Sequence, residues 1–273
     1  MAMDERARNG RDSRPSIRRS PTPISSSMSI SLARAPLLAC LLFLAGCAGA
    51  PAPRPDAVPG DWAGSLGPGG VARWHTSCFR MPFAADGRPV WGRDLLLADR
   101  VLAPLLAAHR GDIALWRFHR RAANDAAGHQ FSLLLYTSDA VYAAIVAAIE
   151  ADPIVARLRQ EAQLTSVQYD CRAAQSRPEL GATSDPAWDP AIQRTWPYFI
   201  MGVSASWLAL VHDLAAAPPA NAPAAEADPV GFYTAIDARI AELWAGQGQH
   251  AYLHHLSGLY GYKPLRIQTW MQF

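Results

Sequence analysis

The sequence predicts an α+β fold for residues 71–273. In the first half of this region, several short segments alternate apolar and polar side chains, as strands with one buried face do. The segments between them repeat apolar residues at helical spacing. After Pro178 the alternation gives way to longer helical patterns. We therefore expect an antiparallel sheet with helices, followed by a mostly helical C-terminal part.

Strand patterns occur in four segments of the first half. In residues 72–83, the side chains of Trp74, Thr76 and Cys78 fall on one face of the expected strand. Residues 122–128 separate the second and third segments and are expected to form a hairpin loop. The remaining strand segments are residues 113–121, 131–137 and 165–171.

Two helical elements separate these strands. Residues 94–109 repeat leucines at helical spacing, with Asp94 expected as the N-cap and Pro104 expected to bend the helix. Ser138 and Asp152 cap two consecutive helices that together form the second element. The order strand, helix, strand, strand, helix, strand fits a ferredoxin-like sandwich, in which the sheet has the spatial order 4-1-3-2 and both helical elements cover one face.

The C-terminal half contains three expected helices and one expected strand. Asp189 and Asp228 are each followed by proline, a pair typical of a helix start, and a third, shorter helix is expected from His250. Glycines within residues 246–248 are expected to end the second of these helices. Residues 264–273 alternate apolar and polar side chains, which predicts a terminal strand at the sheet edge.

Cys78 and Cys171 lie on the first and fourth predicted strands, which are antiparallel neighbours in this sheet order. A disulfide between them is one hypothesis and a pair of buried free thiols is the other, because the register of the two strands cannot be read from the sequence. An oxidising compartment such as the periplasm favours the disulfide.

The run Leu44-Ala45-Gly46-Cys47 ends a short apolar segment that begins at Ala35. This segment is shorter than the roughly 20 residues that a membrane-spanning helix needs. It resembles a bacterial lipoprotein signal peptide with its lipobox; the alternative is a cysteine in a buried helix. The resemblance implies cleavage before Cys47, a diacylglycerol on its sulfur and an acyl group such as palmitate on its amine. Ala48 at the next position implies the outer membrane, with the domain in the periplasm.

The chain is accordingly divided into a leader, residues 1–47, a Pro/Gly/Ala-rich tether, residues 48–70, and the domain, residues 71–273. Translation from Met1 or from Met28 gives the same mature protein. The whole sequence has 25 basic and 23 acidic residues, of which the leader contains seven arginines and three acids. The mature chain therefore has 18 basic and 20 acidic residues. Without a basic stripe, the mature chain is not expected to bind nucleic acid.

The predicted hairpin carries the densest cluster of polar side chains. His119 and Arg121 precede the loop and His129 follows it, so these three are the candidate catalytic residues. Guanidinium groups beside them could hold a carboxylate or phosphate. The alternative is a solvated hairpin tip in which an acid pairs with an arginine, and the constellation fails if the two histidines face opposite sides of the sheet. The candidate binding residues are Arg117, Arg120 and Asp125.

His250 and His254 are four residues apart, a spacing that places two imidazoles on one helix face. Structural and catalytic zinc sites use three or four protein ligands, and this motif supplies no carboxylate. Packed or solvated histidines are therefore the favoured interpretation over a metal site. Nothing in the sequence indicates a cofactor.

Three features between Asp94 and Thr137 carry a second resemblance: a helix with Leu105-Leu106, the strand Trp116–Arg121, and the strand Gly128–Leu133. In this order they resemble part of the thiopeptide-type, or lantibiotic-dehydratase elimination, domain. The arginines that follow the histidine in that family are replaced here by phenylalanine and leucine, so residues that grip its glutamyl substrate are missing. The resemblance implies kinship of fold and not of activity.

The sequence thus predicts a lipid-anchored cell-envelope lipoprotein whose domain binds an unidentified protein or small molecule, or has a structural role. The lipid on Cys47 is expected to attach the protein to the membrane. The alternative is an envelope enzyme that acts on an anionic small molecule through the histidines and arginines of the hairpin. An exposed apolar patch would favour the binding module, and a concave pocket with convergent polar groups would favour the enzyme.

Overall fold

A computed structural model describes residues 72–123, 128–171 and 178–264, which all belong to the compact unit formed by residues 55–273. The predicted leader, the lipobox with Cys47 and the tether lie outside the described residues, as do Asp125 and the final nine residues of the predicted terminal strand. Within the described part, each predicted strand segment of the first half contains a strand.

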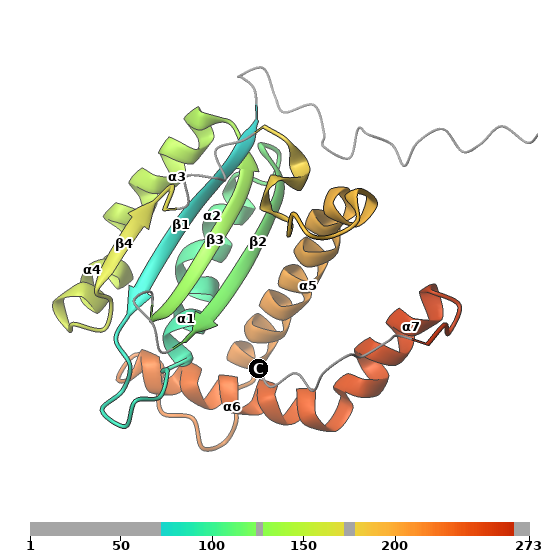
Figure 1. The fold of residues 1–273 in the computed structure, drawn as a ribbon. Helices are drawn as coiled ribbons and strands as arrows, with labels where there is room; N and C mark the ends of the chain where they lie inside the picture. The colour runs from blue at the N-terminus through green and yellow to red at the C-terminus, as the bar shows by residue number, and fades with distance from the viewer. Residues whose placement is uncertain (1–71, 124–127, 172–177, 265–273) are drawn as a thin grey trace, which may run out of the picture. The chain divides into compact units, whose positions relative to one another are not determined.

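Four strands form one antiparallel sheet with the spatial order β2-β3-β1-β4 (Figure 1). Together with the helices, this sheet confirms the α+β class. β1 and β4 are neighbours, so the strands that carry or precede the two cysteines lie side by side. The strands are β1 (Arg73–Met81), β2 (Ile113–Ala122), β3 (His129–Thr137) and β4 (Ser166–Tyr169).

Helices connect β1 to β2 and β3 to β4, and every regular element of the described region after β4 is helical. The segment expected as one helix bent at Pro104 consists of α1, a π-helical turn η2 and α2 in direct succession. The elements between strands are α1 (Gly92–Leu96), η2 (Leu97–Leu102), α2 (Ala103–Ala108), α3 (Asp139–Ala151) and α4 (Pro153–Gln160). Those after β4 are the 3-10 turn η4 (Leu180–Thr183), α5 (Pro190–Ala216), α6 (Pro229–Gly248), the π-helical turn η5 (Gln249–His254) and α7 (His255–Leu259).

The main hydrophobic core lies between the sheet and the layer formed by α1 to α4, which covers one sheet face (Figure 1). Phe131 from β3, Leu97 from η2 and Ile145 from α3 meet there with almost no exposed surface. Val211 from α5 and Ile236 from α6 are fully buried in the same core. The C-terminal helices are therefore integral to the fold and not a separate unit.

Helix α5 runs along the edge of the sheet at β2 (Figure 1). The hydroxyl of Ser204 accepts a hydrogen bond from the backbone N–H of Phe118 at 3.1 Å. Met201, earlier in α5, packs against a small cluster around Trp74 on the sheet face opposite the main core, whereas Val211 lies in the main core. Because α5 occupies the β2 edge, that strand does not present a long free edge to other chains.

Four of the predicted helix caps are confirmed. The side-chain oxygens of Ser138, Asp152, Asp189 and Asp228 each accept hydrogen bonds from backbone N–H groups in the first turn of α3, α4, α5 and α6. These bonds satisfy donors that would otherwise lack a partner at the helix start.

The expected cap at Asp94 is wrong. Helix α1 begins two residues earlier, at Gly92, and has no side-chain cap. The carboxylate of Asp94 points into the protein, where it pairs with Arg120 and His129. The start at Gly92 also permits a close approach to α6, because a Cβ on this residue would lie 2.6 Å from the carbonyl oxygen of Val230.

Helix α6 ends at Gly248, one of the glycines expected to end it, but the backbone does not leave its helical path there. Gly248 is buried and has helical dihedral angles, and the chain continues through η5 into α7. A Cβ at Gly248 would lie 3.0 Å from the ring of Trp244, so the glycine makes room for this indole. The result is an arm, residues 241–264, that extends away from the sheet in Figure 1.

Candidate functional site

A polar cluster is enclosed between β2, β3, α1 and α6. The fully buried carboxylate of Asp94 accepts a hydrogen bond from Nε of Arg120 at 3.0 Å and lies 2.9 Å from Nε2 of His129. Arg120 also donates from Nη2 to Asp237 on α6 at 2.9 Å. A buried carboxylate needs such partners, because removing it from water is costly. The cluster therefore ties the β2–β3 hairpin to both helices.

Two indole rings enclose the guanidinium of Arg120. Its Cζ lies 4.6 Å from the ring centroid of Trp91 and 5.2 Å from that of Trp207. Trp91 also meets the ring of His129 edge-on at 5.0 Å, and His129 is fully buried. Cation–π contacts of this kind stabilise a partly desolvated guanidinium. We interpret the cluster as a structural tie, since its arginine is engaged by two carboxylates and its histidine has no exposed surface.

The remaining hairpin candidates lie on the other face of the sheet. Side chains alternate along β2, so Arg117, His119 and Arg121 point away from the face that carries Arg120. His129 is on the Arg120 side. The structure thus does not bring His119 and His129 together, and the predicted constellation of His119, Arg121 and His129 is not formed. Arg117 donates to a backbone carbonyl of η4 at 3.3 Å.

A second buried histidine lies at the start of β1. The ring of His75 stacks on Tyr142 with centroids 4.1 Å apart, and its nitrogens lie 3.4 Å from Asp170 and 3.2 Å from Asp139. Burial lowers the pKa of His75 below its usual 6.5, against the opposing effect of Asp170. A hydrogen bond from Arg73 lowers the pKa of Asp139. This group fastens β1 to α3 and to the residue after β4.

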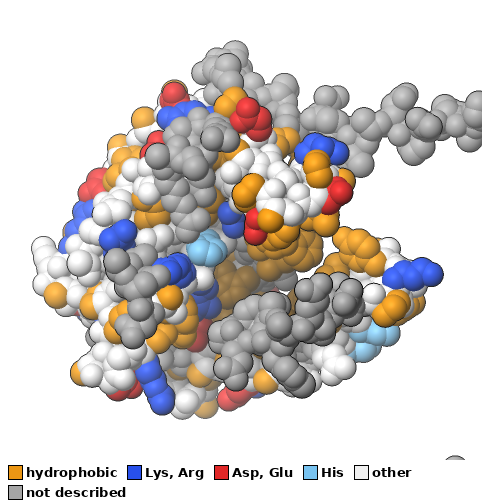
Figure 2. All heavy atoms as spheres, in the orientation of Figure 1, with side chains coloured by type: hydrophobic (Ala, Val, Ile, Leu, Met, Phe, Trp, Pro, Cys, Tyr) orange, Lys and Arg blue, Asp and Glu red, His pale blue; other side chains and the backbone are white. Residues whose placement is uncertain are grey.

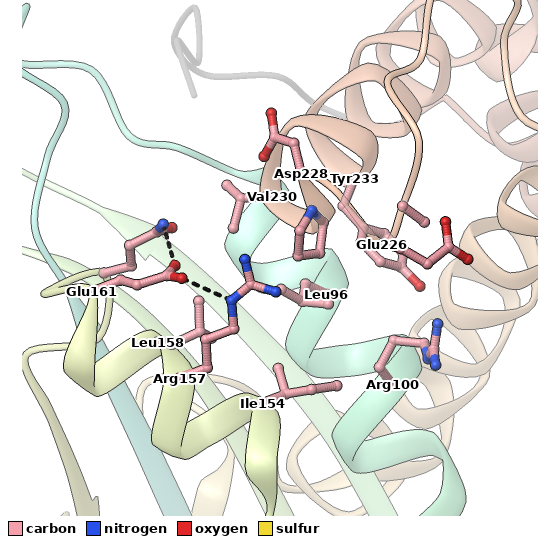
Figure 3. Close-up of a pocket in the computed structure, with 13 residues that line it drawn as sticks. Leu96, Arg100, Ile154, Arg157, Leu158, Glu161, Glu226, Asp228, Val230 and Tyr233 are labelled. Carbon is pink, nitrogen blue, oxygen red and sulfur yellow. Dashed lines mark hydrogen bonds and ion pairs between the residues drawn. The ribbon is translucent and has the colours of Figure 1, made fainter.

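A pocket of about 230 Å³ lies between η2, α4 and α6 (Figure 3). Arg157 donates to Glu161 across its wall at 2.7 Å, and the hydroxyl of Tyr233 donates to the buried Asp99. Burial and this hydrogen bond raise the pKa of Tyr233. Ligand pockets commonly measure 300–1,000 Å³, so this one is small. Neither this pocket nor the wider hollow beside it, of about 650 Å³, is lined by a candidate residue from the hairpin.

The three histidines of the arm lie close together where η5 passes into α7. The rings of His250 and His254 are stacked with centroids 5.3 Å apart, and the ring of His255 lies 5.3 and 5.5 Å from them. In a π-helical turn, residues five apart lie on the same side, which brings His255 close to His250 and His254. Within the described ranges, no group of three His, Cys, Asp or Glu side chains is arranged to hold a metal ion.

Large hydrophobic side chains are exposed on α5 and on the arm. Every exposed large hydrophobic residue of the described ranges belongs to one of these two segments, which we call the apolar helical surface. Figure 2 shows hydrophobic side chains of both segments around a hollow between them. The residues are Ile192, Phe199 and Val203 on α5, and Trp244, Tyr252, Leu253, Leu259, Tyr260 and Tyr262 on the arm.

A disulfide joins Cys78 on β1 to Cys171, two residues after the end of β4. The two Cα atoms are 6.3 Å apart, which lies within the usual range for a disulfide. Nε2 of Gln130 on β3 lies 3.3 Å from the sulfur of Cys78. The bond therefore fixes the β1–β4 edge of the sheet.

The candidate site thus differs from the one that the sequence suggests. Some polar residues of the hairpin belong to the structural tie, and the others lie on the opposite face of the sheet. The apolar helical surface contains large hydrophobic side chains that are exposed, although folded proteins ordinarily bury such side chains. Comparison with protein-family models gives no match for this chain, and comparisons with curated proteins and with solved structures give none either.

Proposed function

We propose that this protein is a lipid-anchored lipoprotein of the cell envelope whose domain acts as a binding module in the periplasm. The apolar helical surface is the single observation that carries the binding role. Contiguous exposed hydrophobic side chains on a folded domain mark sites of interaction with proteins, membranes or ligands. Trp244, Leu259 and Tyr260 are 58%, 85% and 72% exposed, which is an unfavourable arrangement unless another surface covers them.

Two observations support the proposed compartment. The lipobox at Cys47 predicts export and lipid attachment, and the disulfide between Cys78 and Cys171 suits an oxidising environment such as the periplasm. We also infer that residues 72–171 form a ferredoxin-like sandwich. The strand order and the placement of α1 to α4 on one face support that assignment.

Metabolic labelling with palmitate tests the anchor. Wild-type chain expressed in a bacterial host should incorporate the label and remain with the membrane fraction, because two or more acyl chains hold a protein stably on a bilayer. Cys47→Ala should lose both properties. Cys40→Ala, which changes the other cysteine of the leader, is the matched control and should keep them. Labelling that persists in Cys47→Ala, or that is absent from the wild type, would contradict the proposal.

A further inference from the structure

We propose that the apolar helical surface lies against the phospholipid bilayer, so that the domain has a second membrane contact besides its anchor. This inference rests on the proposed function, since the lipid on Cys47 is what holds the domain near a membrane. The surface contacts the bilayer at the boundary between the acyl chains and the headgroups.

Charged side chains are absent from the central stretch of each segment of the surface. Residues 195–211 of α5 and residues 243–262 of the arm contain no Asp, Glu, Lys or Arg. Charged side chains are costly at the hydrocarbon boundary, whereas a protein-binding surface commonly has a polar, charged rim. Two charge-free segments of this length, both exposed, favour a lipid surface over a protein partner.

The side chains of the arm are the types that bilayer interfaces favour. Trp244, Tyr252, Tyr260 and Tyr262 each combine a large ring with one polar group, and all four are exposed. Such residues concentrate where the hydrocarbon meets the headgroups, because the ring is buried while the polar group stays hydrated. Leu259, the most exposed of the large hydrophobic residues, supplies a purely apolar contact among them.

Helix α5 meets the bilayer along its side and does not cross it. By length and composition it could span a membrane, with a mean hydropathy of 1.5 over its most apolar stretch, of which only 11% is buried. However, Ser204 is bonded to the backbone of β2 and Val211 is buried in the main core, so one side of α5 is fixed to the sheet. Another side of α5 carries Ile192, Phe199 and Val203, which are exposed and available to lipid.

The chain between anchor and domain permits this contact. Residues 48–71 separate Cys47 from the described domain, and 24 residues span at most about 80 Å when fully extended. A tethered domain samples the membrane at a high effective concentration, so even weak lipid contacts become occupied. Because residues 195–211 and 243–262 contain no Lys or Arg, we expect binding to zwitterionic lipid without a need for anionic headgroups.

Fluorescence quenching in proteoliposomes tests the inference. The full lipidated chain is reconstituted in phosphatidylcholine vesicles whose acyl chains carry bromine near the headgroup, and wild type is compared with Trp244→Phe. The expected result is that brominated lipid removes the part of the fluorescence that depends on Trp244. Trp74→Phe, which changes a buried indole, is the control and should leave the quenchable part unchanged. Leu259→Asp should weaken the quenching of Trp244, whereas Ala144→Asp, on the exposed side of α3, should not.

Each other outcome has a defined meaning. If Cys47 carries lipid but brominated lipid does not reach Trp244 and aqueous iodide does, the inference is overturned and the proposed function stands. If neither quencher reaches Trp244, a protein or a second copy covers the arm and the inference is again overturned. If Cys47 carries no lipid, the proposed function fails and the inference fails with it.

Discussion

Reduction of the disulfide between Cys78 and Cys171 should cost the domain a large part of its stability. The two cysteines are 93 residues apart, so the bond closes a loop that contains most of the sheet and its helices. In the chain-entropy model, a loop of this length restricts the unfolded chain by about 4.6 kcal/mol at 25 °C. With a slope of about 2 kcal/mol per molar urea, the unfolding midpoint should fall by about 2 M.

Urea unfolding followed by tryptophan fluorescence, with and without dithiothreitol, measures this shift. A Cys78→Ala/Cys171→Ala variant should unfold near the midpoint of the reduced wild type and should not respond to reductant. Equal midpoints for oxidised and reduced wild type, in samples whose masses differ by the two hydrogens of the reduced bond, would show that the disulfide does not stabilise the domain. The same holds if both thiols of the untreated protein react with an alkylating reagent under denaturing conditions.

Four further changes have defined outcomes. Arg120→Met should lower the free energy of unfolding by about 3 kcal/mol, because it leaves the buried carboxylate of Asp94 with one partner fewer. Gly92→Ala should cost about 1–3 kcal/mol, since the new Cβ would meet the backbone of α6. Burial lowers the pKa of His75, so between pH 7 and pH 5 the unfolded chain takes up a proton that the folded chain does not. The wild type should therefore lose up to about 1.4 kcal/mol of stability per pH unit in this range, and His75→Gln should lose less. Hydrogen bonds from Arg159 and Tyr169 lower the pKa of Glu150 to about 2, at a site that remains partly exposed. The wild type should therefore lose about 1 kcal/mol of stability as the pH falls from 4.5, and Glu150→Gln should lack this contribution at every pH.

Urea titrations measure all four, the last two across a pH series. Arg159→Met, which breaks an exposed ion pair, controls for Arg120→Met and should cost no more than about 1 kcal/mol. Gly202→Ala, on an exposed part of α5 with no atom close to the new Cβ, controls for Gly92→Ala and should be neutral or stabilising. Variants that match their controls, or a His75→Gln profile parallel to that of the wild type, would show that the contacts described do not act as stated.

Local signals in the sequence were enough for much of the fold. Alternation located the strands, and the Asp-Pro pairs at Asp152, Asp189 and Asp228 located helix starts, because a cap and the turn that it caps are adjacent in the chain. Asp94 resembles such a cap but has partners 26 and 35 residues away. Nothing in its neighbourhood reveals them.

The candidate site was harder to predict for two physical reasons. Neighbouring residues of a strand face opposite sides, so a cluster that is dense in sequence, such as Arg120 and Arg121, is divided in space. The aromatic residues after Pro178 look like helix core, and only the absence of charge over residues 195–211 and 243–262 could have marked them as a surface with an unusual partner. Likewise, Gly248 marks the end of α6 in the sequence, but nothing near it reveals that the helical backbone continues into η5.

Intact-protein mass spectrometry of the membrane fraction directly tests the proposal that lipid on Cys47 anchors the protein in the cell envelope. The wild type should have the mass of residues 47–273 plus a diacylglycerol and an acyl chain, and its non-reduced mass should be two hydrogens lower than its reduced mass. Cys47→Ala should lack the lipid. An unmodified chain that retains residues 1–46 would contradict both the anchor and the compartment.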